Sequence, residues 1–195
     1  PTLNTLSLYF NYRYRDWRKI KDVVEGQNAI FAAGERYLPR LTGQSDAEYD
    51  AYRSRGCFFN ATYRTLQVMT GILLRKPPTF IDPYDAFPES VVNNITGSGL
   101  SIWDYTRLVI DNLVTFGYCG NLVDMNEDGT PYFSLYSADS ILNFNVVDRE
   151  LQFLVLSEVL YEPSPQDLFA GQQIERIRLY YLDENDNVVC EVFQA

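Results

Sequence analysis

The spacing of apolar residues changes near Gly117, from a helical repeat to the repeat of β-strands. Before that residue, apolar side chains recur at intervals of three and four in the stretches 14–26, 46–75 and 101–116. Repeats of 3.6 and 2 residues predict helices and strands, respectively. The predicted strands are 119–125, 132–136, 151–161, 174–182 and 188–193. We therefore expect an α+β fold, with a mainly helical part over 1–117 and an antiparallel β-rich part over 118–195.

The longest predicted helix spans residues 46 to about 75. It begins with the capping-box pattern of Ser45 and Glu48, in which each side chain satisfies a free backbone N–H of the other residue. Gly56 weakens a helix by about 1 kcal/mol relative to Ala, so a bend is expected near it. The apolar positions at helical spacing are Tyr49, Tyr52, Phe59, Tyr63, Leu66, Met69 and Leu73. Of these, the side chains expected to be buried are Phe59, Tyr63, Leu66 and Met69.

The remaining segments are predicted from turn residues and interruptions of the pattern. Residues 1–10 have no clear period and are expected to form an N-terminal arm. Gly and Pro punctuate residues 27–44, which predicts an irregular connection. One short helix is expected around 89–94, and a single helical turn after Ser137. The sequence EPSPQ at 162–166 is expected to interrupt the strands.

The composition favours a folded, non-enzymatic protein. Apolar residues make up 46% of the 195 residues, which excludes a disordered chain. No apolar run reaches the roughly 18 residues needed to span a bilayer, so we expect no membrane partner. The chain has no His, which excludes Ser-His and Cys-His nucleophile pairs and His-ligated metals. Three Cys without a CxxC pair argue against a disulfide framework or a cysteine-based zinc site.

Charge divides the chain unevenly. Residues 1–77 carry 12 Lys/Arg and 7 Asp/Glu, a net charge of +5. Residues 78–195 carry 4 Lys/Arg and 19 Asp/Glu, a net charge of −15. Such asymmetry fits two parts that complement each other across a subunit contact. It equally fits a basic helical face and acidic turns that are both simply solvated.

Four acidic or glycine-rich patterns are candidates for chemistry. The sequences NEDG (126–129) and DENDN (183–187) offer oxygen ligands for a hard cation but lack the calcium-loop spacing, so turns are favoured. Asp104 and Asp111 share a helix face, and Arg107 between them can pair with both. The GSG at 97–99 lacks a phosphate-loop lysine. We expect no catalytic residue, no metal site and no cofactor.

A basic, aromatic stretch at 11–21 is the strongest candidate for an interaction surface. Lys and Arg neutralise phosphates, and interleaved aromatic rings can stack on bases. The alternative is an amphipathic helix with a basic solvent face and Trp17 in the core. The basic residues that could face DNA or a neighbouring subunit are Arg13, Arg15, Arg18, Lys19, Lys21, Arg53 and Arg55.

Several segments, taken in order, resemble the N-terminal part of tailed-bacteriophage portal proteins. They are DWRKIKDVVEG, ERYLPRL, YDAYRSRGCFFNATYRTLQVMTGILLRKPP, SIWDYTRLVIDNLVTFGYCGNLVDM and LYSADSILNF. The most specific piece is the run from 52 to 78, and its family-like core residues are Tyr52, Arg55, Phe59, Asn60, Tyr63, Arg64, Thr65, Leu66 and Met69. None of these pieces is a catalytic fingerprint, and the resemblance lies in their order and spacing.

The resemblance implies a structural role and a set of partners. Portal subunits assemble as a homo-oligomeric ring, usually of twelve, that replaces one capsid vertex, passes double-stranded DNA without sequence specificity, and binds terminase, the major capsid protein and neck or tail adaptors. The implied location is the virion, with assembly in the host cytoplasm. The residues here would form most of the wing, with long helices and a β-rich part, and stem, clip and crown would follow Ala195.

Two other functions stay open. Another ring-forming phage head-completion or neck protein would obey the same physics in a different place in the particle. A carboxylate-based, metal-dependent enzyme would have to work with Asp, Glu, Lys or Tyr, because the chain has no His.

Overall fold

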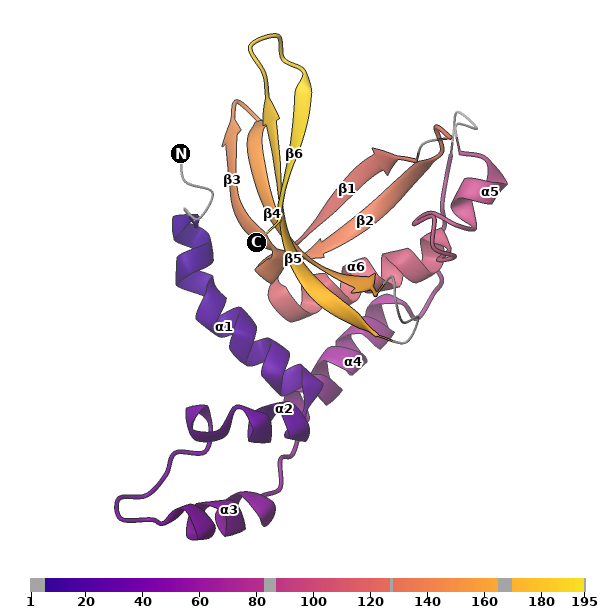
Figure 1. The fold of residues 1–195 in the computed structure, drawn as a ribbon. Helices are drawn as coiled ribbons and strands as arrows, with labels where there is room; N and C mark the ends of the chain where they lie inside the picture. Colours follow the sequence, from indigo (N-terminus) through magenta and orange to yellow (C-terminus); the bar gives the residue numbers. More distant parts are fainter. Residues whose placement is uncertain (1–5, 83–86, 127, 165–169, 195) are drawn as a thin grey trace. The chain divides into compact units, whose positions relative to one another are not determined.

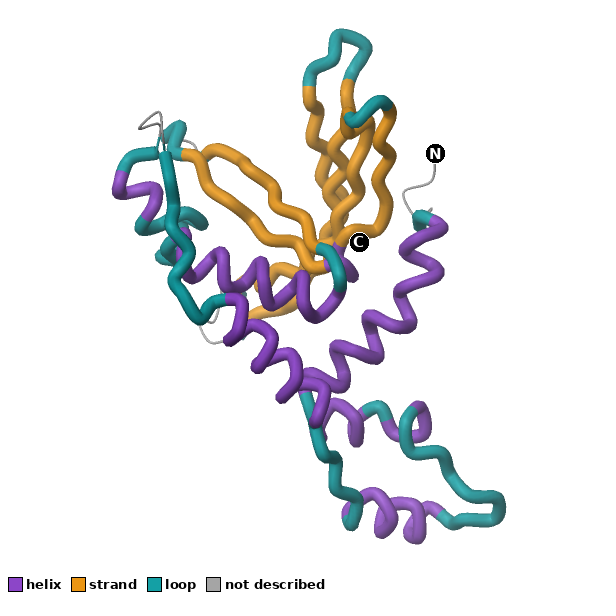
Figure 2. The backbone as a smooth tube through the Cα atoms, turned by 180° about the vertical axis from the view of Figure 1, so that it is seen from behind, coloured by secondary structure: helices purple, strands orange, loops and turns teal. Residues whose placement is uncertain are grey.

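The fold is α+β, as the sequence predicts (Figures 1 and 2). The computed structural model describes residues 6–82, 87–126, 128–164 and 170–194. The chain forms two compact units, one of Asp16–Gly117 and one of Pro1–Arg15 with Tyr118–Ala195. The first residues therefore group with the strands, whereas the sequence analysis assigned them to the helical part.

The helices begin earlier and are more broken than the sequence predicts. Their bounds are α1 Leu8–Glu25, α2 Gln27–Ala32, η1 Gly34–Arg36, α3 Asp46–Ser54, α4 Ala61–Leu73, α5 Glu89–Val92 and α6 Ile102–Phe116. The predicted arm is helical from Leu8 because the Ser7 hydroxyl accepts a hydrogen bond from the backbone N–H of Phe10 at 2.9 Å. Residues 1–5 of that arm lie outside the described residues. The connection at 27–44 contains α2 and η1 and is not wholly irregular.

The long helix predicted over 46–75 is two helices, separated by residues 55–60. Gly56 lies against Phe31, and a Cβ atom at this glycine would come within 3.1 Å of the phenyl ring. Asn60 then starts α4, because its side-chain oxygen accepts a hydrogen bond from the Tyr63 N–H at 2.9 Å. The prediction of a continuous helix was wrong because a second capping residue lies inside it.

The burial predicted for this region was also wrong. Phe59 is 70% exposed, Met69 47% and Tyr63 41%, and Leu66 is half-buried. The buried residue of α4 is Thr70, whose hydroxyl donates to the Asp111 carboxylate of α6 at 2.7 Å. Helix α4 therefore packs on α6 through the side that carries Thr70, and the predicted apolar residues Tyr63 and Leu66 adjoin that contact without being fully buried.

Replacing Asn60 tests the second cap. Its side-chain N–H also donates to the Val23 carbonyl at 2.6 Å, so the residue holds α4 to α1 as well as capping it. We expect Asn60→Ala to lower the free energy of unfolding by about 1–2 kcal/mol in a urea titration, because a capping side chain contributes about 1 kcal/mol. Asn60→Ser keeps a capping acceptor and loses the Val23 contact without placing a charge beside that carbonyl, so it should cost less than Asn60→Ala. Equal costs for the two variants would assign the effect to the Val23 contact alone.

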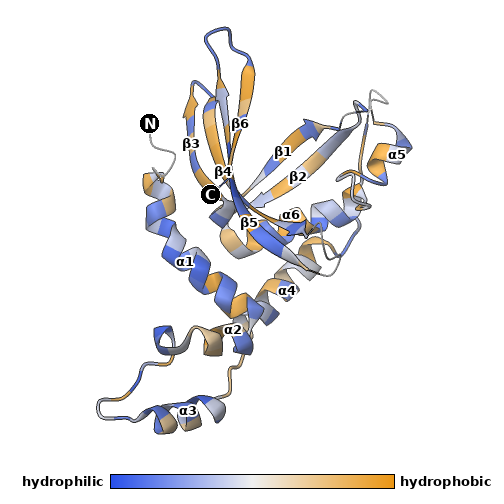
Figure 3. Ribbon diagram, viewed as in Figure 1, coloured by the Kyte–Doolittle hydropathy of each residue, from blue (hydrophilic) through white to orange (hydrophobic). Residues whose placement is uncertain are grey.

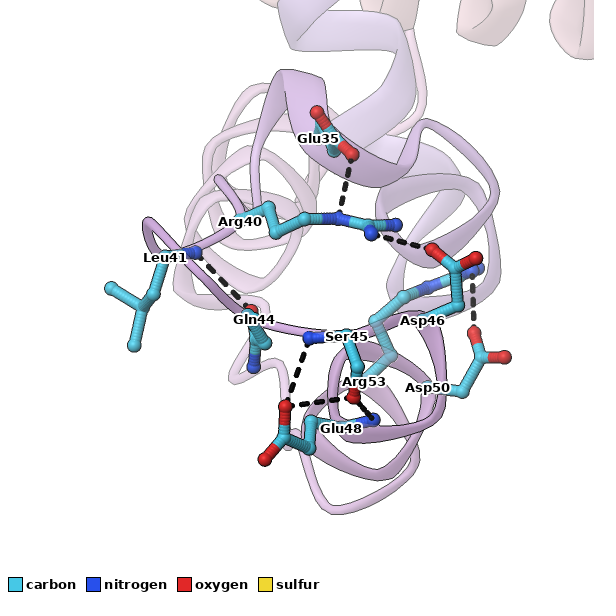
Figure 4. A network of polar contacts seen from close by, with 9 residues as sticks. All are labelled: Glu35, Arg40, Leu41, Gln44, Ser45, Asp46, Glu48, Asp50 and Arg53. Atoms are coloured by element: carbon cyan, nitrogen blue, oxygen red, sulfur yellow. Dashed lines mark hydrogen bonds and ion pairs between the residues drawn. The ribbon is translucent and has the colours of Figure 1, made fainter.

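A polar network fixes the start of α3 (Figure 4). Ser45 and Glu48 form the predicted capping box, with N–H to oxygen distances of 2.9 and 3.4 Å. Arg40 bridges from Glu35, at 3.2 Å, to Asp46 of α3, at 2.5 Å, and its guanidinium lies over the Tyr49 ring. The loop before α3 is thereby held by side chains at its surface.

The core of the helical unit is small. Its buried apolar residues are Trp17, Ile30, Tyr49, Val91, Ile95 and Tyr105. Trp17 is completely buried, and its indole N–H donates to the Phe116 carbonyl at 3.2 Å. Ser101 caps α6 and Gly117 ends it in the left-handed conformation, as predicted. The indole thus satisfies a carbonyl in the last turn of α6 that has no partner within the helix.

The strand unit contains an antiparallel pair and a four-stranded antiparallel sheet (Figure 1). The strands are β1 Cys119–Met125, β2 Pro131–Ser137, β3 Ile141–Val147, β4 Glu150–Pro163, β5 Gly171–Leu182 and β6 Val188–Gln194. Strand β1 pairs with β2, and the larger sheet has the order β3-β4-β5-β6. The helical turn after Ser137 is η2, Ala138–Ser140, as expected, but β3 was missed.

Strand β3 was missed because its register is irregular. Its pairing with β4 shifts between Ile141 and Asn143 and again between Asn145 and Val146. These shifts break the two-residue alternation on which strand prediction depends. The core of this unit is formed by Phe10, Ala138, Ile141, Val155 and Leu156. Residues 165–166 of the predicted EPSPQ break lie outside the described residues.

Candidate assembly surfaces and a buried ionic cluster

The basic residues of α1 lie along a polar helix (Figure 3). Arg15, Arg18 and Lys19 are exposed and share one face through three- and four-residue spacing. Lys21 is also exposed, and Arg13 is half-buried. Trp17 points to the core, so the amphipathic reading of this stretch is correct for the tryptophan.

The two predicted basic residues of α3 have different surroundings. Arg53 donates to the Phe31 carbonyl at 2.6 Å, lies 3.8 Å from the Asp50 carboxylate and covers the Tyr49 ring. Arg55 is exposed, and its Nε donates to the Ala51 carbonyl at 3.0 Å. Arg53 therefore stabilises its own unit, and only Arg55 of this pair is available to another molecule.

The residues of the family-like run do not form a core. Tyr52, Arg64 and Thr65 are exposed, and the Thr65 hydroxyl donates to the Ala61 carbonyl within α4 at 3.0 Å. The Arg64 guanidinium lies 5.2 Å from the centre of the Phe59 ring. Most of the run is therefore surface, with Asn60 as its structural residue.

Helix α4 presents apolar side chains to solvent as well as to α6. Val68, Ile72 and Leu73 are 61%, 68% and 60% exposed, and Met69 adjoins them. We call Val68, Met69, Ile72 and Leu73 the outer face of α4. Adjoining apolar side chains on the exposed side of a helix usually mark a surface that another molecule covers. Val68 and Ile72 lie outside the apolar repeat seen in the sequence, and Met69, within that repeat, was expected to be buried.

Glu158 forms the centre of an ionic cluster in the strand unit. Its carboxylate accepts hydrogen bonds from Arg176 of β5, from Arg178 of β5 at 3.1 Å, and from the Tyr136 hydroxyl of β2 at 2.5 Å. The Glu158 side chain is only 11% exposed, and the two arginine side chains are 22% and 19% exposed. Arg178 also lies 3.8 Å from Asp124 of β1. The cluster therefore links the β1–β2 pair to the four-stranded sheet.

Charge in this cluster is balanced, which favours a structural role. Two carboxylates face two guanidinium groups, and the Tyr180 hydroxyl accepts from Arg178 at 3.0 Å. Burial and then the hydrogen bond to Glu158 raise the pKa of Tyr136 above its ordinary value, so its hydroxyl stays protonated at neutral pH. No group of the cluster is held as a free base or nucleophile.

The Glu158 carboxyl of the ionic cluster should make the stability of the fold depend on pH. Burial tends to raise the pKa of Glu158, but the Tyr136 and Arg176 hydrogen bonds and the arginine charges outweigh it and lower that pKa below 4.5. A carboxyl with a lowered folded-state pKa stabilises the fold above its unfolded pKa, and this contribution is lost as the pH falls through the folded value. We expect urea unfolding to show wild-type stability declining below about pH 4.5 more steeply than that of Glu158→Gln. Parallel profiles for the two proteins would contradict this assignment.

Signals for this cluster were present in the sequence. Arg176, Arg178 and Tyr180 occupy every second position of β5, between the apolar Ile177 and Leu179. Charged residues at alternate positions of an otherwise apolar strand indicate a polar, partly buried face. The sequence alone does not show that Glu158 is the partner of these arginines, because Glu158 comes opposite Arg176 only through the register of β4 and β5.

The two acidic turns and the glycine-rich turn serve local structure. Asp183 accepts hydrogen bonds from the N–H groups of Asn185 and Asn187, at 2.8 and 2.9 Å, as a turn residue does. In the other acidic turn, Asp128 accepts from the Thr130 N–H at 2.9 Å, and Glu127 lies outside the described residues. Asn94 accepts from the Gly99 N–H at 2.6 Å and closes the glycine-rich turn.

The predicted pairing of Arg107 with two carboxylates is not the arrangement found. Asp104 accepts from the Ser101 hydroxyl at 2.6 Å, and Asp111 accepts from Thr70. Within the described ranges, no three His, Cys, Asp or Glu side chains come together in a way that could hold a metal ion. Likewise, no helix in the described part of the chain is long and apolar enough to cross a membrane.

Comparison with known proteins adds no relative. No protein-family model matches the chain, and no curated protein matches its sequence. Any function must therefore be argued from the surfaces themselves and from the order of the sequence segments.

Proposed function

We propose that the chain is a structural subunit of a ring-shaped portal of a tailed bacteriophage. The observation that carries the proposal is the outer face of α4, four apolar residues that remain in contact with solvent. Contiguous exposed apolar surface usually marks a site of association. A subunit of a ring exposes such a surface when alone and covers it in the assembly.

The order of segments supports the portal over other assemblies. The run from 52 to 78 and the helix-to-strand passage through Gly117 resemble that family in type and spacing. A protein of this class needs no catalytic residue, and a chain without His fits that role. In this proposal the ring forms the conduit for DNA during packaging and ejection, and binds terminase, the capsid and neck or tail proteins.

Electron microscopy of the purified protein tests the proposal. We expect closed rings of about twelve subunits with an axial hole, because every contact in a ring joins two different faces and closes on itself. Rings with another number of subunits would favour a head-completion or neck protein. A monomer that hydrolyses a substrate only with added metal would favour the enzyme and overturn the proposal.

The basic face of α1 supplies a second test. Arg18 and Lys19 are exposed, so reversing their charge should leave the melting temperature unchanged. We expect Arg18→Glu with Lys19→Glu to reduce the ring fraction in sedimentation at low salt, because surface ion pairs are screened as salt rises. Rings that persist while DNA retention falls would show that these residues face DNA rather than a neighbour.

A further inference from the structure

The segment of the chain that carries the outer face of α4 is basic, and no acidic residue lies between Asp50 and Asp82 in the sequence. Residues 51–81 contain five Lys or Arg and no Asp or Glu. Among the described residues, no carboxylate pairs with Arg64, Arg75 or Lys76. An apolar surface with unpaired cations at its border is suited to an apolar surface with carboxylates at its border.

One face of the four-stranded sheet has these properties. The register places Val159 of β4 opposite Glu175 of β5, with both side chains on the same face. Tyr161 lies two residues further along that face, and Val159 and Tyr161 are each 60% exposed. Glu191 of β6 is on the same face, because it pairs with Leu179. We call Val159, Tyr161, Glu175 and Glu191 the acidic sheet face.

The charge of the surrounding chain agrees with this pairing. Residues 148–191 contain ten Asp or Glu and three Lys or Arg, and two of those three cations, Arg176 and Arg178, already pair with Glu158. Two copies of the α4 face would bring like charges together, as would two copies of the acidic sheet face. Like charges brought together across an interface oppose association, so neither face is suited to pack against a second copy of itself.

We infer that the outer face of α4 of one copy packs against the acidic sheet face of a second copy of this chain. The contact is heterologous, since two different surfaces meet. Apolar contact excludes water at the centre, and Arg64, Arg75 and Lys76 face carboxylates at the border. The inference rests on the proposed function, because repetition of this contact through a closing rotation generates the ring.

Two variants, each with one altered face, test the contact. Ile72→Asp with Leu73→Asp introduces charge on α4, and Val159→Asp with Tyr161→Asp introduces charge on the sheet. All four side chains are exposed, so each variant should remain folded and unfold in a single cooperative thermal transition, although Asp is a poor strand and helix former. The matched control is Leu41→Asp, which replaces an apolar side chain, 73% exposed, in the loop before α3.

Sedimentation equilibrium gives the expected result. Each variant alone should associate at least about tenfold more weakly than the wild type, because charge at the centre of an apolar contact must be desolvated without a partner. The Leu41→Asp protein should associate like the wild type. An equimolar mixture of the two variants should form one-to-one dimers and nothing larger, because only one intact pair of faces remains.

Three outcomes would overturn the inference. The first is an α4 variant that associates as strongly as the wild type. The second is a mixture of the two variants that stays monomeric although the wild type associates. The third is a wild-type protein that is monomeric at every concentration. Electron microscopy separates this inference from the portal proposal. Closed rings formed by the α4 variant would remove the inference and leave the proposed function. If the mixture of variants dimerises but the wild type forms only open filaments, the proposed function is contradicted and the inference stands.

Discussion

Replacing Trp17 by Ala is expected to lower the free energy of unfolding by about 3–5 kcal/mol, the usual cost of truncating a buried aromatic side chain. The side chain is completely buried, and its N–H satisfies the Phe116 carbonyl. Truncation removes the largest side chain of a small core and leaves that carbonyl without its partner. Urea unfolding followed by far-ultraviolet circular dichroism measures the effect.

The second tryptophan of the chain provides the control for this prediction. Trp103 on α6 is 41% exposed, so Trp103→Ala should cost less than about 1 kcal/mol. Trp17→Phe keeps most of the buried apolar surface and loses the N–H, so its cost should fall between the two. A Trp17→Ala protein as stable as Trp103→Ala would mean that the helical unit is not built around Trp17.

Removal of the Glu158 carboxylate should lower the free energy of unfolding by about 3 kcal/mol, because breaking a buried ion pair leaves its partner charge uncompensated. Glu158→Ala leaves Arg176 and Arg178, both mostly buried, with their shared acceptor gone. The Tyr136 hydroxyl loses its acceptor as well. The measurement is urea unfolding at pH 7, where the carboxyl is ionised.

The control for Glu158 is a carboxylate of the same strand. Glu162 lies four residues along β4 and is exposed, so Glu162→Ala should change the free energy of unfolding by less than about 0.5 kcal/mol. If both variants unfold at the same urea concentration as the wild type, the cluster orients the strands without adding to the free energy of unfolding.

Local sequence signals correctly predicted the helices and strands whose first and last residues are set by nearby capping or turn residues. Helix α6 lies between Ser101 and Gly117 as predicted, and β1 has the predicted bounds. Capping and turn residues form hydrogen bonds within three or four positions, so all the groups involved lie in one short segment of the sequence. The same reasoning failed at Asn60, because an apolar repeat that continued through it outweighed a cap that was equally visible.

Burial could not be predicted from spacing alone. The repeat through Tyr63, Leu66 and Met69 correctly indicated a helix, but it does not show what covers each side of that helix. The ionic cluster depends on contacts between β2, β4 and β5, which are distant in sequence. Four of the five basic residues predicted on α1 are exposed and Arg13 is half-buried, because long charged side chains are costly to bury.

The two edges of the four-stranded sheet differ in a way that bears on solubility. Strand β3 shifts register twice, and such bulges twist an edge away from flat pairing with another chain. Strand β6 pairs with β5 in continuous register from Val188 to Gln194, and within the described strands its other side has no neighbour. Val188 and Val192 on this strand are exposed, and Glu191 supplies the charge that opposes stacking. In concentrated solution, unwanted strand addition between molecules is therefore expected at β6.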